Sequence, residues 1–178
     1  MKNVNWDTVQ DDVRRPVPGG YAAKITRVED DENKEYLRIE WEFAEGEFKG
    51  ANQETYDAFG FWPMTMFRSY KEKALRFFKA FKIAVEESNR NFVFKNDPQS
   101  LVGKFIGVVL GEEEYLASDG KVKTRLYVSA TKAGNDIRDG NFTVPELKKL
   151  ATAPANNFGS QPVSNYDLLD DNDADCPF

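Results

Sequence analysis

The chain of 178 residues contains no histidine and a single cysteine, Cys176, close to its C-terminal end. These scarcities exclude whole classes of site. No Ser-His or Cys-His nucleophile pair can form, and neither can a zinc site of His and Cys ligands within one chain. An intrachain disulfide is equally impossible, so we expect the reducing environment of the cytoplasm.

Long apolar runs are missing too. No stretch is apolar enough to span a membrane, and the first residues lack the apolar core of a signal peptide. There is no glycine-rich phosphate loop followed by lysine. The acidic run Glu112-Glu113-Glu114 is a poor metal site, because adjacent residues of a strand point to opposite faces. We therefore expect no enzyme activity, no cofactor or metal, and no membrane partner.

Aromatic side chains, in contrast, make up 13% of the residues, and surplus rings often form exposed stacking surfaces. The net charge of −6 is unevenly distributed. Residues 151–178 hold five Asp and no Lys or Arg, so the first 150 residues carry 24 basic and 25 acidic groups, a net charge of −1. Any groove that binds an anion must therefore come from local clustering of cations.

Composition divides the chain into three regions. Residues 1–19 are expected to form an arm, because the prolines and glycines of segment 14–20 cannot continue a helix or a central strand. Residues 20–150 are expected to form the folded body. Residues 151–178 have little apolar material to bury and end in an Asp-rich run, so we predict a disordered linker and acidic tail.

Apolar periodicity predicts a mainly β body. The clearest strand is 36–43, where strict alternation places four apolar side chains on one face: Leu37, Ile39, Trp41 and Phe43. Further strands are predicted at 21–29, 52–61, 101–115 and 121–130. Phe59 and Phe61 are expected in the core. A tight turn is expected at Ser118-Asp119-Gly120, because glycine takes the positive φ that such turns need.

Apolar spacing of three and four residues predicts a helix over 65–88. Three strands, one helix and a closing hairpin are typical of an OB fold, a five-stranded Greek-key barrel with one α-helix between strands three and four. Gly103, Gly107 and Gly111, within the fourth strand, suggest sharp coiling at a barrel corner.

The end of the chain carries a first family resemblance. Several Asp, then an apolar residue, Pro and a C-terminal Phe resemble the acidic tip of bacterial single-stranded DNA-binding proteins. The resemblance implies that this tip docks onto replication, recombination or repair proteins, with Phe178 in an apolar pocket. The residues concerned are Asp170, Asp171, Asp173, Asp175, Cys176, Pro177 and Phe178.

Two departures from that pattern are expected to weaken docking. Cys176 stands where the family has a larger aliphatic residue, and Asn172 and Ala174 interrupt the acidic run. An alternative is that the tail only keeps the protein soluble.

The body is similar to a group of phage and prophage proteins from Gram-positive bacteria. The likeness covers about residues 20–150, and the stretches that carry it are EYLRIE (35–40), FGFW (59–62), RSYKEKAL (68–75), LVGK (101–104) and GEEEY (111–115). It implies a phage-encoded single-stranded DNA-binding protein that acts in the cytoplasm of the bacterial host.

Single strands bind where a basic groove follows the phosphates and rings stack on bases. An OB barrel usually binds on strands two and three, helped by the loops that join strands one and two and strands four and five. Combined rings and cations on these elements give the candidate DNA-binding residues Lys34, Tyr36, Arg38, Tyr56, Trp62, Lys121, Lys123, Arg125 and Tyr127. The alternative is that each Tyr packs and each Arg pairs with a neighbouring Glu. The basic face of the helix is either solvated or a nonspecific phosphate contact.

We therefore expect a protein that binds single-stranded DNA with little sequence preference during phage replication and recombination, and that recruits partners through its tail. It is expected to be a monomer or a homodimer. A second hypothesis is an OB-fold protein-interaction module, such as a phage inhibitor of a host protein, because the body is near neutral in charge. A third keeps DNA binding and adds strand annealing or recombination loading.

Overall fold

The computed structural model describes residues 14–150. Five strands form one antiparallel sheet in the order β3-β2-β1-β4-β5. They are β1 (Gly19–Asp31), β2 (Tyr36–Phe43), β3 (Thr65–Ser69), β4 (Phe105–Leu116) and β5 (Val122–Lys132). The expectation of a mainly β body with a five-stranded sheet is confirmed.

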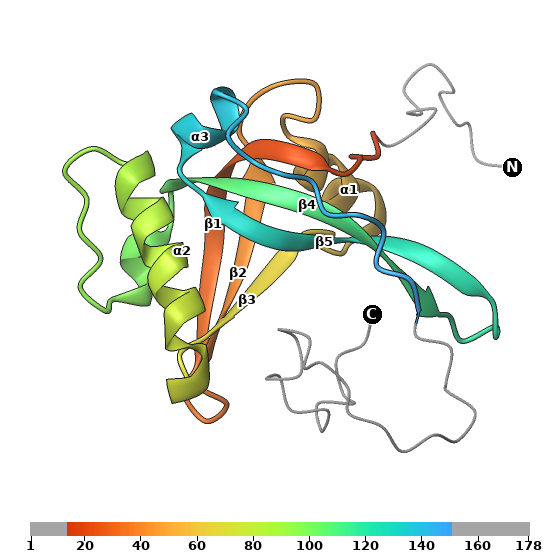
Figure 1. Ribbon diagram of the computed structural model, residues 1–178, viewed down its shortest axis with the longest axis horizontal. Coiled ribbons are helices and arrows are strands. Elements are labelled where there is room, and N and C mark those ends of the chain that lie inside the picture. The colour runs from red at the N-terminus through yellow and green to blue at the C-terminus, as the bar shows by residue number, and fades with distance from the viewer. Residues whose placement is uncertain (1–13, 151–178) are drawn as a thin grey trace, which may run out of the picture.

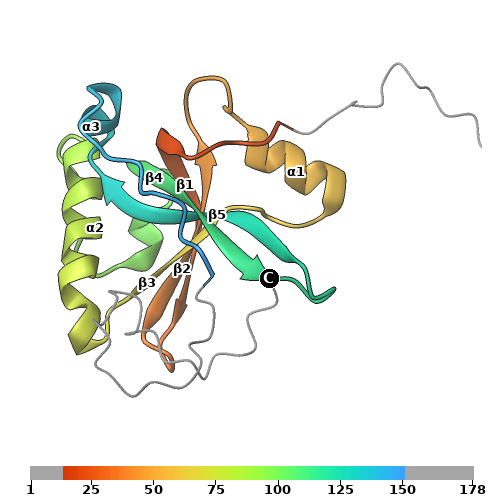
Figure 2. The ribbon, with the colours of Figure 1, turned by 45° about the vertical axis from the view of Figure 1, so that its right-hand side comes forward.

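Within residues 14–150, three α-helices and two short 3₁₀ helices accompany the sheet: α1 (Ala51–Phe59), η2 (Glu72–Ala74), α2 (Leu75–Ser88), η3 (Pro98–Leu101) and α3 (Gly134–Arg138). In Figures 1 and 2, α2 lies on one side of the sheet and α1 on the other. No helix in residues 14–150 is both long and apolar enough to pass through a lipid bilayer.

The core lies between the sheet and α2. The four alternating apolar residues of β2 are all buried, so the period-two prediction for 36–43 is confirmed. They pack against apolar side chains of β1 and β4 and against Phe81, Ala84 and Val85 of α2. Full burial of one such large side chain stabilises the fold by roughly 1.5–3 kcal/mol, so this cluster is the main stabilising feature.

The predicted strand at 52–61 is wrong, because this segment forms α1. Two glycines in the left-handed region, Gly50 (φ 80°) and Gly60 (φ 77°), bracket the helix. The Glu42 carboxylate accepts hydrogen bonds from the backbone N–H groups of Asn52 (3.1 Å) and Gln53 (2.7 Å). These first-turn donors have no partner within a helix, so a cap from β2 stabilises α1.

The predicted helix over 65–88 is wrong in its first part, where β3 forms instead. Met66 pairs with Ile39 of β2 and is buried, so backbone pairing and burial outweigh the helical spacing. The remainder, α2, is confirmed as a helix between the third and fourth strands of the chain. The predicted turn at 118–120 is also confirmed, with Gly120 at φ 74° and its N–H bonded to the carbonyl of Ala117.

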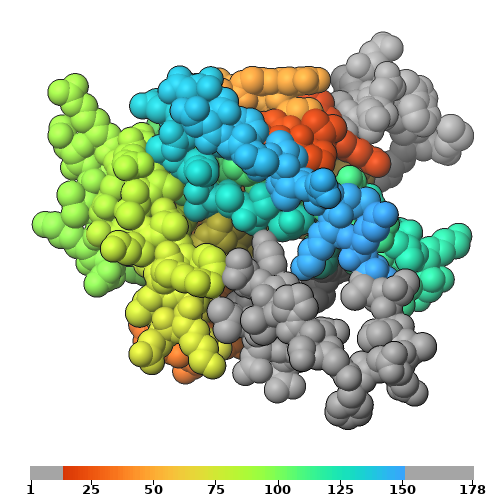
Figure 3. Space-filling model, viewed as in Figure 1, coloured from red at the N-terminus to blue at the C-terminus, as the bar shows by residue number. Residues whose placement is uncertain are grey.

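The residues after α3 cross the outer face of the sheet, opposite the core, and we call residues 139–150 the strap. A Cβ at Gly20 would lie 2.5 Å from the Phe142 ring, and one at Gly111 would lie 2.6 Å from Pro145. The glycines of β4 thus make room for α3 and the strap, and no barrel-corner role is needed to explain them. Near its end the strap bridges to β4, at Lys148 and Glu113. Figure 3 shows the strap in blue, running over the sheet.

The structure also describes residues 14–19 of the predicted arm. Arg14 bonds to the side chain of Glu54 in α1 and to the carbonyl oxygens of Glu47 and Lys49. This contact ties the segment before β1 to α1. Residues 1–13 of the arm and the whole predicted tail, 151–178, lie outside the described residues.

Candidate nucleic-acid interface

Two aromatic rings meet on the outer face of β2 and β3. The sheet register places Arg38 opposite Phe67, and the Tyr36 and Phe67 rings lie edge to face with centroids 5.3 Å apart. Phe67 is 39% exposed and Tyr36 is partly buried. This ring pair presents aromatic surface to solvent on β2 and β3.

Arg38, however, is held by carboxylates. Its guanidinium forms ion pairs with Glu29 of β1 (3.1 Å) and with Glu40 on its own strand (3.2 Å). Beside it, a shallow hollow is lined mainly by acidic residues at the end of β1 and in the β1–β2 turn: Glu29, Asp30, Asp31, Glu32, Asn33, Tyr36 and Arg38. The alternative interpretation, an Arg paired with neighbouring Glu residues, therefore describes Arg38. Lys34 lies exposed in the same turn.

Cations outnumber carboxylates on the next segment of the chain. Residues 68–82 carry six Lys or Arg and one acidic residue, Glu72. Within the described part of the chain, Lys71, Lys73 and Lys79 form no ion pair, and all three are exposed. Figure 3 shows η2 and α2, in yellow-green, along one flank of the molecule.

Hydrogen bonds hold this basic segment beside the ring pair. The Tyr70 N–H donates to the carbonyl of Glu35 (2.9 Å), and the Tyr70 hydroxyl donates to the Asp30 carboxylate (2.8 Å). Desolvation of the hydroxyl, followed by the bond to Asp30 and nearby acidic charge, raises the pKa of Tyr70 to about 12. Because Tyr36 follows Glu35 directly, Lys71 and the ring pair lie at the same end of the sheet.

A second aromatic group lies on α1 and the loop after it. The Tyr56 and Trp62 rings, both candidate residues, have centroids 6.1 Å apart, and Tyr56 lies on a helix rather than on the predicted strand. The Trp62 indole N–H donates to the carbonyl of Trp41 (3.2 Å), and the residue is partly buried. Phe59 and Phe61, predicted to be core, are 64% and 56% exposed and stack on each other. That prediction is wrong, because the segment is a helix end and loop.

The remaining predicted residues share the β4–β5 hairpin. Lys123 pairs with Asp119 (3.1 Å), and Arg125 pairs with Glu113 (2.8 Å) while its guanidinium lies over the Tyr115 ring. Tyr127 is partly buried, and burial followed by the charge of Glu113 raises its pKa. Lys121 is exposed beside the turn. Both paired cations of the hairpin are thus largely neutralised by local acids.

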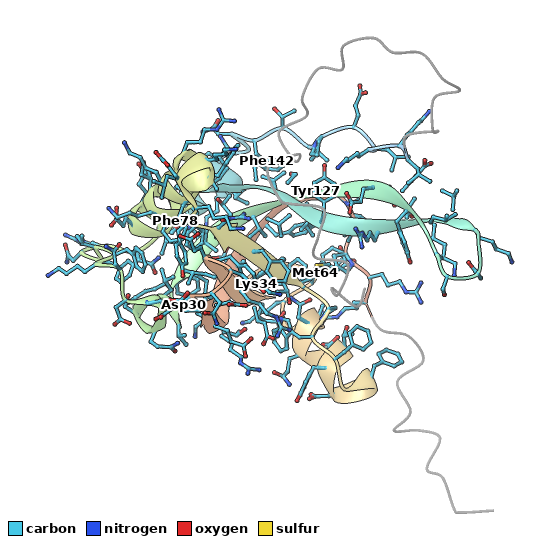
Figure 4. The ribbon with its side chains drawn as sticks, turned by 90° about the horizontal axis from the view of Figure 1, so that it is seen from below. Asp30, Lys34, Met64, Phe78, Tyr127 and Phe142 are labelled. Atoms are coloured by element: carbon cyan, nitrogen blue, oxygen red, sulfur yellow. The ribbon has the colours of Figure 1, made fainter. Side chains whose placement is uncertain are left out.

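The predicted residues do not form one continuous groove. Arg38 lies opposite Glu29 of β1, whereas Glu113 lies three residues beyond Leu110, which pairs with Gly19 at the start of β1. Ten residues of β1 separate these positions, or about 33 Å at ~3.3 Å per residue. Figure 1 shows the hairpin and the β1–β2 turn at different ends of the molecule, and Figure 4 shows Lys34 away from Tyr127.

Comparison with known proteins adds no family assignment. No protein-family model and no curated protein matches the chain. Within residues 14–150, no group of three or more His, Cys, Asp or Glu side chains is arranged to hold a metal ion.

Sequence analysis did not name Phe67 as a candidate, and it left open whether the basic face that carries Lys71 and Lys73 is solvated or contacts phosphate. Phe67 was counted in a helical apolar stripe, which concealed its place on a strand beside Tyr36. The excess of cations over 68–82 was visible and is the signal that points to this surface. The predicted partner-binding residues, 170–178, lie outside the described residues, and their role stays a prediction.

Proposed function

We propose that the chain binds single-stranded DNA with little sequence preference through the outer face of β2 and β3. The observation that carries the proposal is the partly exposed Tyr36–Phe67 ring pair beside lysines that have no ion pair among the described residues. The rings stack on bases, and Lys71 and Lys73 contact phosphates. The rings and the cations without an ion pair lie at the same end of the sheet, and a single strand needs both.

The fold supports this proposal. The order β3-β2-β1-β4-β5 is that of an OB barrel opened between β3 and β5. The helix α2 follows β3 and contacts both β3 and β5, the two strands that closure would bring together. We therefore propose that the body is an OB fold, a class whose nucleic-acid surface is centred on the second and third strands.

Local charge determines which of the predicted residues contribute most to phosphate binding. Arg38, Lys123 and Arg125 are each paired with carboxylates, so their contribution to phosphate binding is small. Lys71 and Lys73, which form no ion pair among the described residues, therefore supply most of the electrostatic attraction. The acidic tail, through Phe178 and the Asp residues before it, recruits replication or recombination proteins, as its resemblance to bacterial single-stranded DNA-binding proteins implies.

The test is a fluorescence titration of the full chain with an oligo(dT) strand at several salt concentrations. Stacking of about 1–3 kcal/mol per base predicts that Tyr36→Ala and Phe67→Ala each weaken binding by roughly 5- to 150-fold. Each lost phosphate contact reduces the slope of log K against log salt by about 0.7, so Lys71→Ala/Lys73→Ala reduces it by about 1.4.

The matched control is Tyr115→Ala/Lys132→Ala, which removes a ring and a cation from β4 and β5, away from the ring pair. Absence of binding at low salt refutes the proposed function. Binding that is insensitive to all four substitutions at the proposed surface moves the site elsewhere.

The exposed Phe59 and Phe61 favour a second candidate, a protein-interaction module. It predicts capture of a protein partner by the body in the absence of any oligonucleotide, with loss of capture in Phe59→Ala/Phe61→Ala.

A further inference from the structure

An exposed aromatic patch lies at the end of α1. It consists of Tyr56, Phe59 and Phe61, each about half to two thirds exposed, and we call it the α1 patch. Taking ~200 Å² for each ring residue, its exposed apolar area is roughly 300 Å². Contiguous apolar surface of this size on a folded chain often marks an interaction site.

The surroundings of the α1 patch are acidic. Residues 42–57 contain five carboxylates and one lysine. Arg14 and Arg138 pair with Glu54 and Glu45, but Asp57, within the helix that carries the patch, is exposed and is bonded by the amide of Gln53. Negative charge beside the rings disfavours a phosphate backbone and favours an occupant that carries cations.

A surface with the complementary character lies on α2. Leu75 and Ile83 are 49% and 41% exposed, and we call them, with the cations Arg76 and Lys79, the α2 patch. Leu75, Lys79 and Ile83 follow one another at a spacing of four residues, which places them in one row on the helix. Helix periodicity places Arg76 beside this row, so charged and apolar side chains alternate within the patch.

We propose that the chain associates head to tail, with the α1 patch of one copy seated on the α2 patch of the next. Apolar area meets apolar area, and an acidic rim meets a basic one. Figures 1 and 2 place α1 and α2 on opposite sides of the sheet, so the two patches of one copy cannot meet each other. A contact between two different surfaces leaves one of each free at the ends of the assembly, so it repeats into a row of copies.

The area predicts a weak contact in free solution. A stable interface buries about 800 Å² on each partner, whereas the α1 patch offers roughly 300 Å² of ring surface. Association should therefore need high protein concentration, and added salt should weaken it, because its charged rim is exposed. If the chain also binds single strands as proposed above, neighbours on one strand gain from their high effective concentration, and binding becomes cooperative.

The test uses the full chain without DNA, so its outcome is independent of the proposed function. Sedimentation velocity is measured over a range of protein concentrations at low and high salt. One variant, Phe59→Lys/Phe61→Lys, disables the α1 patch, and the other, Lys79→Glu/Ile83→Glu, disables the α2 patch. The control, Leu116→Ala/Val122→Ala, removes exposed apolar side chains from the hairpin. Circular dichroism checks that each variant is folded.

We expect the wild type and the control to form concentration-dependent oligomers at low salt. Each patch variant alone should lose association by roughly tenfold or more, as is typical when a central interface side chain is removed. An equimolar mixture of the two variants retains one intact α1 patch and one intact α2 patch. The mixture should therefore form dimers and nothing larger.

Three results overturn the proposal. The first is a wild-type sedimentation coefficient that does not rise with concentration. The second is normal association of the α2 variant alone, which indicates that α1 patches meet each other. The third is a mixture that stays monomeric.

Discussion

The substitution Gly20→Ala, which adds a methyl group, tests how the strap is held against the sheet. A Cβ placed at Gly20 lies 2.5, 2.6 and 2.7 Å from three atoms of the Phe142 ring. Optimal contact between carbon atoms is about 3.5–4.0 Å, so the ring must move by roughly 1 Å in Gly20→Ala. Overpacking of this kind costs about 1–3 kcal/mol of unfolding free energy.

The companion change, Phe142→Ala, removes a partly buried ring and should cost roughly 1–2 kcal/mol on its own. In Gly20→Ala/Phe142→Ala the new methyl group has no ring to meet. The double variant should therefore be about as stable as Phe142→Ala alone. The coupling free energy between the two sites should be about 1–3 kcal/mol, in the direction of rescue.

A second pair of sites provides the control. A Cβ at Gly107 lies 2.4 Å from a side-chain carbon of Ile137, but also 2.9 Å from the backbone oxygens of both Ala133 and Lys132. Ile137→Ala removes the first clash and leaves the two carbonyl contacts, so Gly107→Ala/Ile137→Ala should show little rescue. Urea unfolding followed by tryptophan fluorescence, to which buried Trp41 contributes, measures all six variants. Strictly additive costs at Gly20 and Phe142 refute the packing of the strap described above.

Three further predictions concern the core, the basic segment and the tail. Ile39→Ala should cost roughly 2–5 kcal/mol in urea unfolding, whereas Leu126→Ala, at a partly buried position, should cost roughly 1 kcal/mol. Because the pKa of Tyr70 is raised from 10.0 to about 12, its neutral form stabilises the fold fully below pH 10, and this contribution is lost as pH rises towards 12. Titration of phenolate absorbance should show a late tyrosine whose pKa falls in Asp30→Asn, and an unchanged pKa in that variant contradicts the hydrogen bond. Deletion of residues 170–178 should abolish partner pull-down and leave oligo(dT) affinity unchanged or higher at low salt, while Phe178→Ala should lose the pull-down alone; loss of DNA binding on deletion refutes this assignment.

The periodicity of apolar residues predicted the secondary structure correctly where the surroundings of a segment do not change along its length. The alternation of Leu37, Ile39, Trp41 and Phe43 gave β2, and the hairpin turn followed from Gly120. It failed where distant groups decide the structure. The cap that stabilises α1 comes from Glu42, ten residues before Asn52, and the pairing of Met66 with Ile39 overrides a helical pattern that begins in the same residues.

The sequence predicted which types of residue lie at the candidate site, but not which residues they pair with. Alternation placed Arg38 on the polar face of its strand, and the sequence does not reveal that the register of β1 brings Glu29 against it. Phe59 and Phe61 were assigned to the wrong environment for a related reason. An apolar pair beside Gly60 has the same composition in a strand as at the end of a helix, and tertiary context determines its exposure.

The strap has a consequence for the order in which the chain folds during synthesis. Gly20 is among the first body residues to be translated, and Phe142, which covers it, is among the last. All five strands are therefore available for pairing before the strap can cover the face of β1 and β4 that carries Gly20 and Gly111. Contacts between residues so far apart in sequence form slowly, because a long loop must close first. A nascent or truncated chain that stops before Phe142 thus leaves exposed the part of β1 and β4 that the strap covers in the complete fold. Exposed surface of this kind is bound by chaperones and can pair with other unpaired strands.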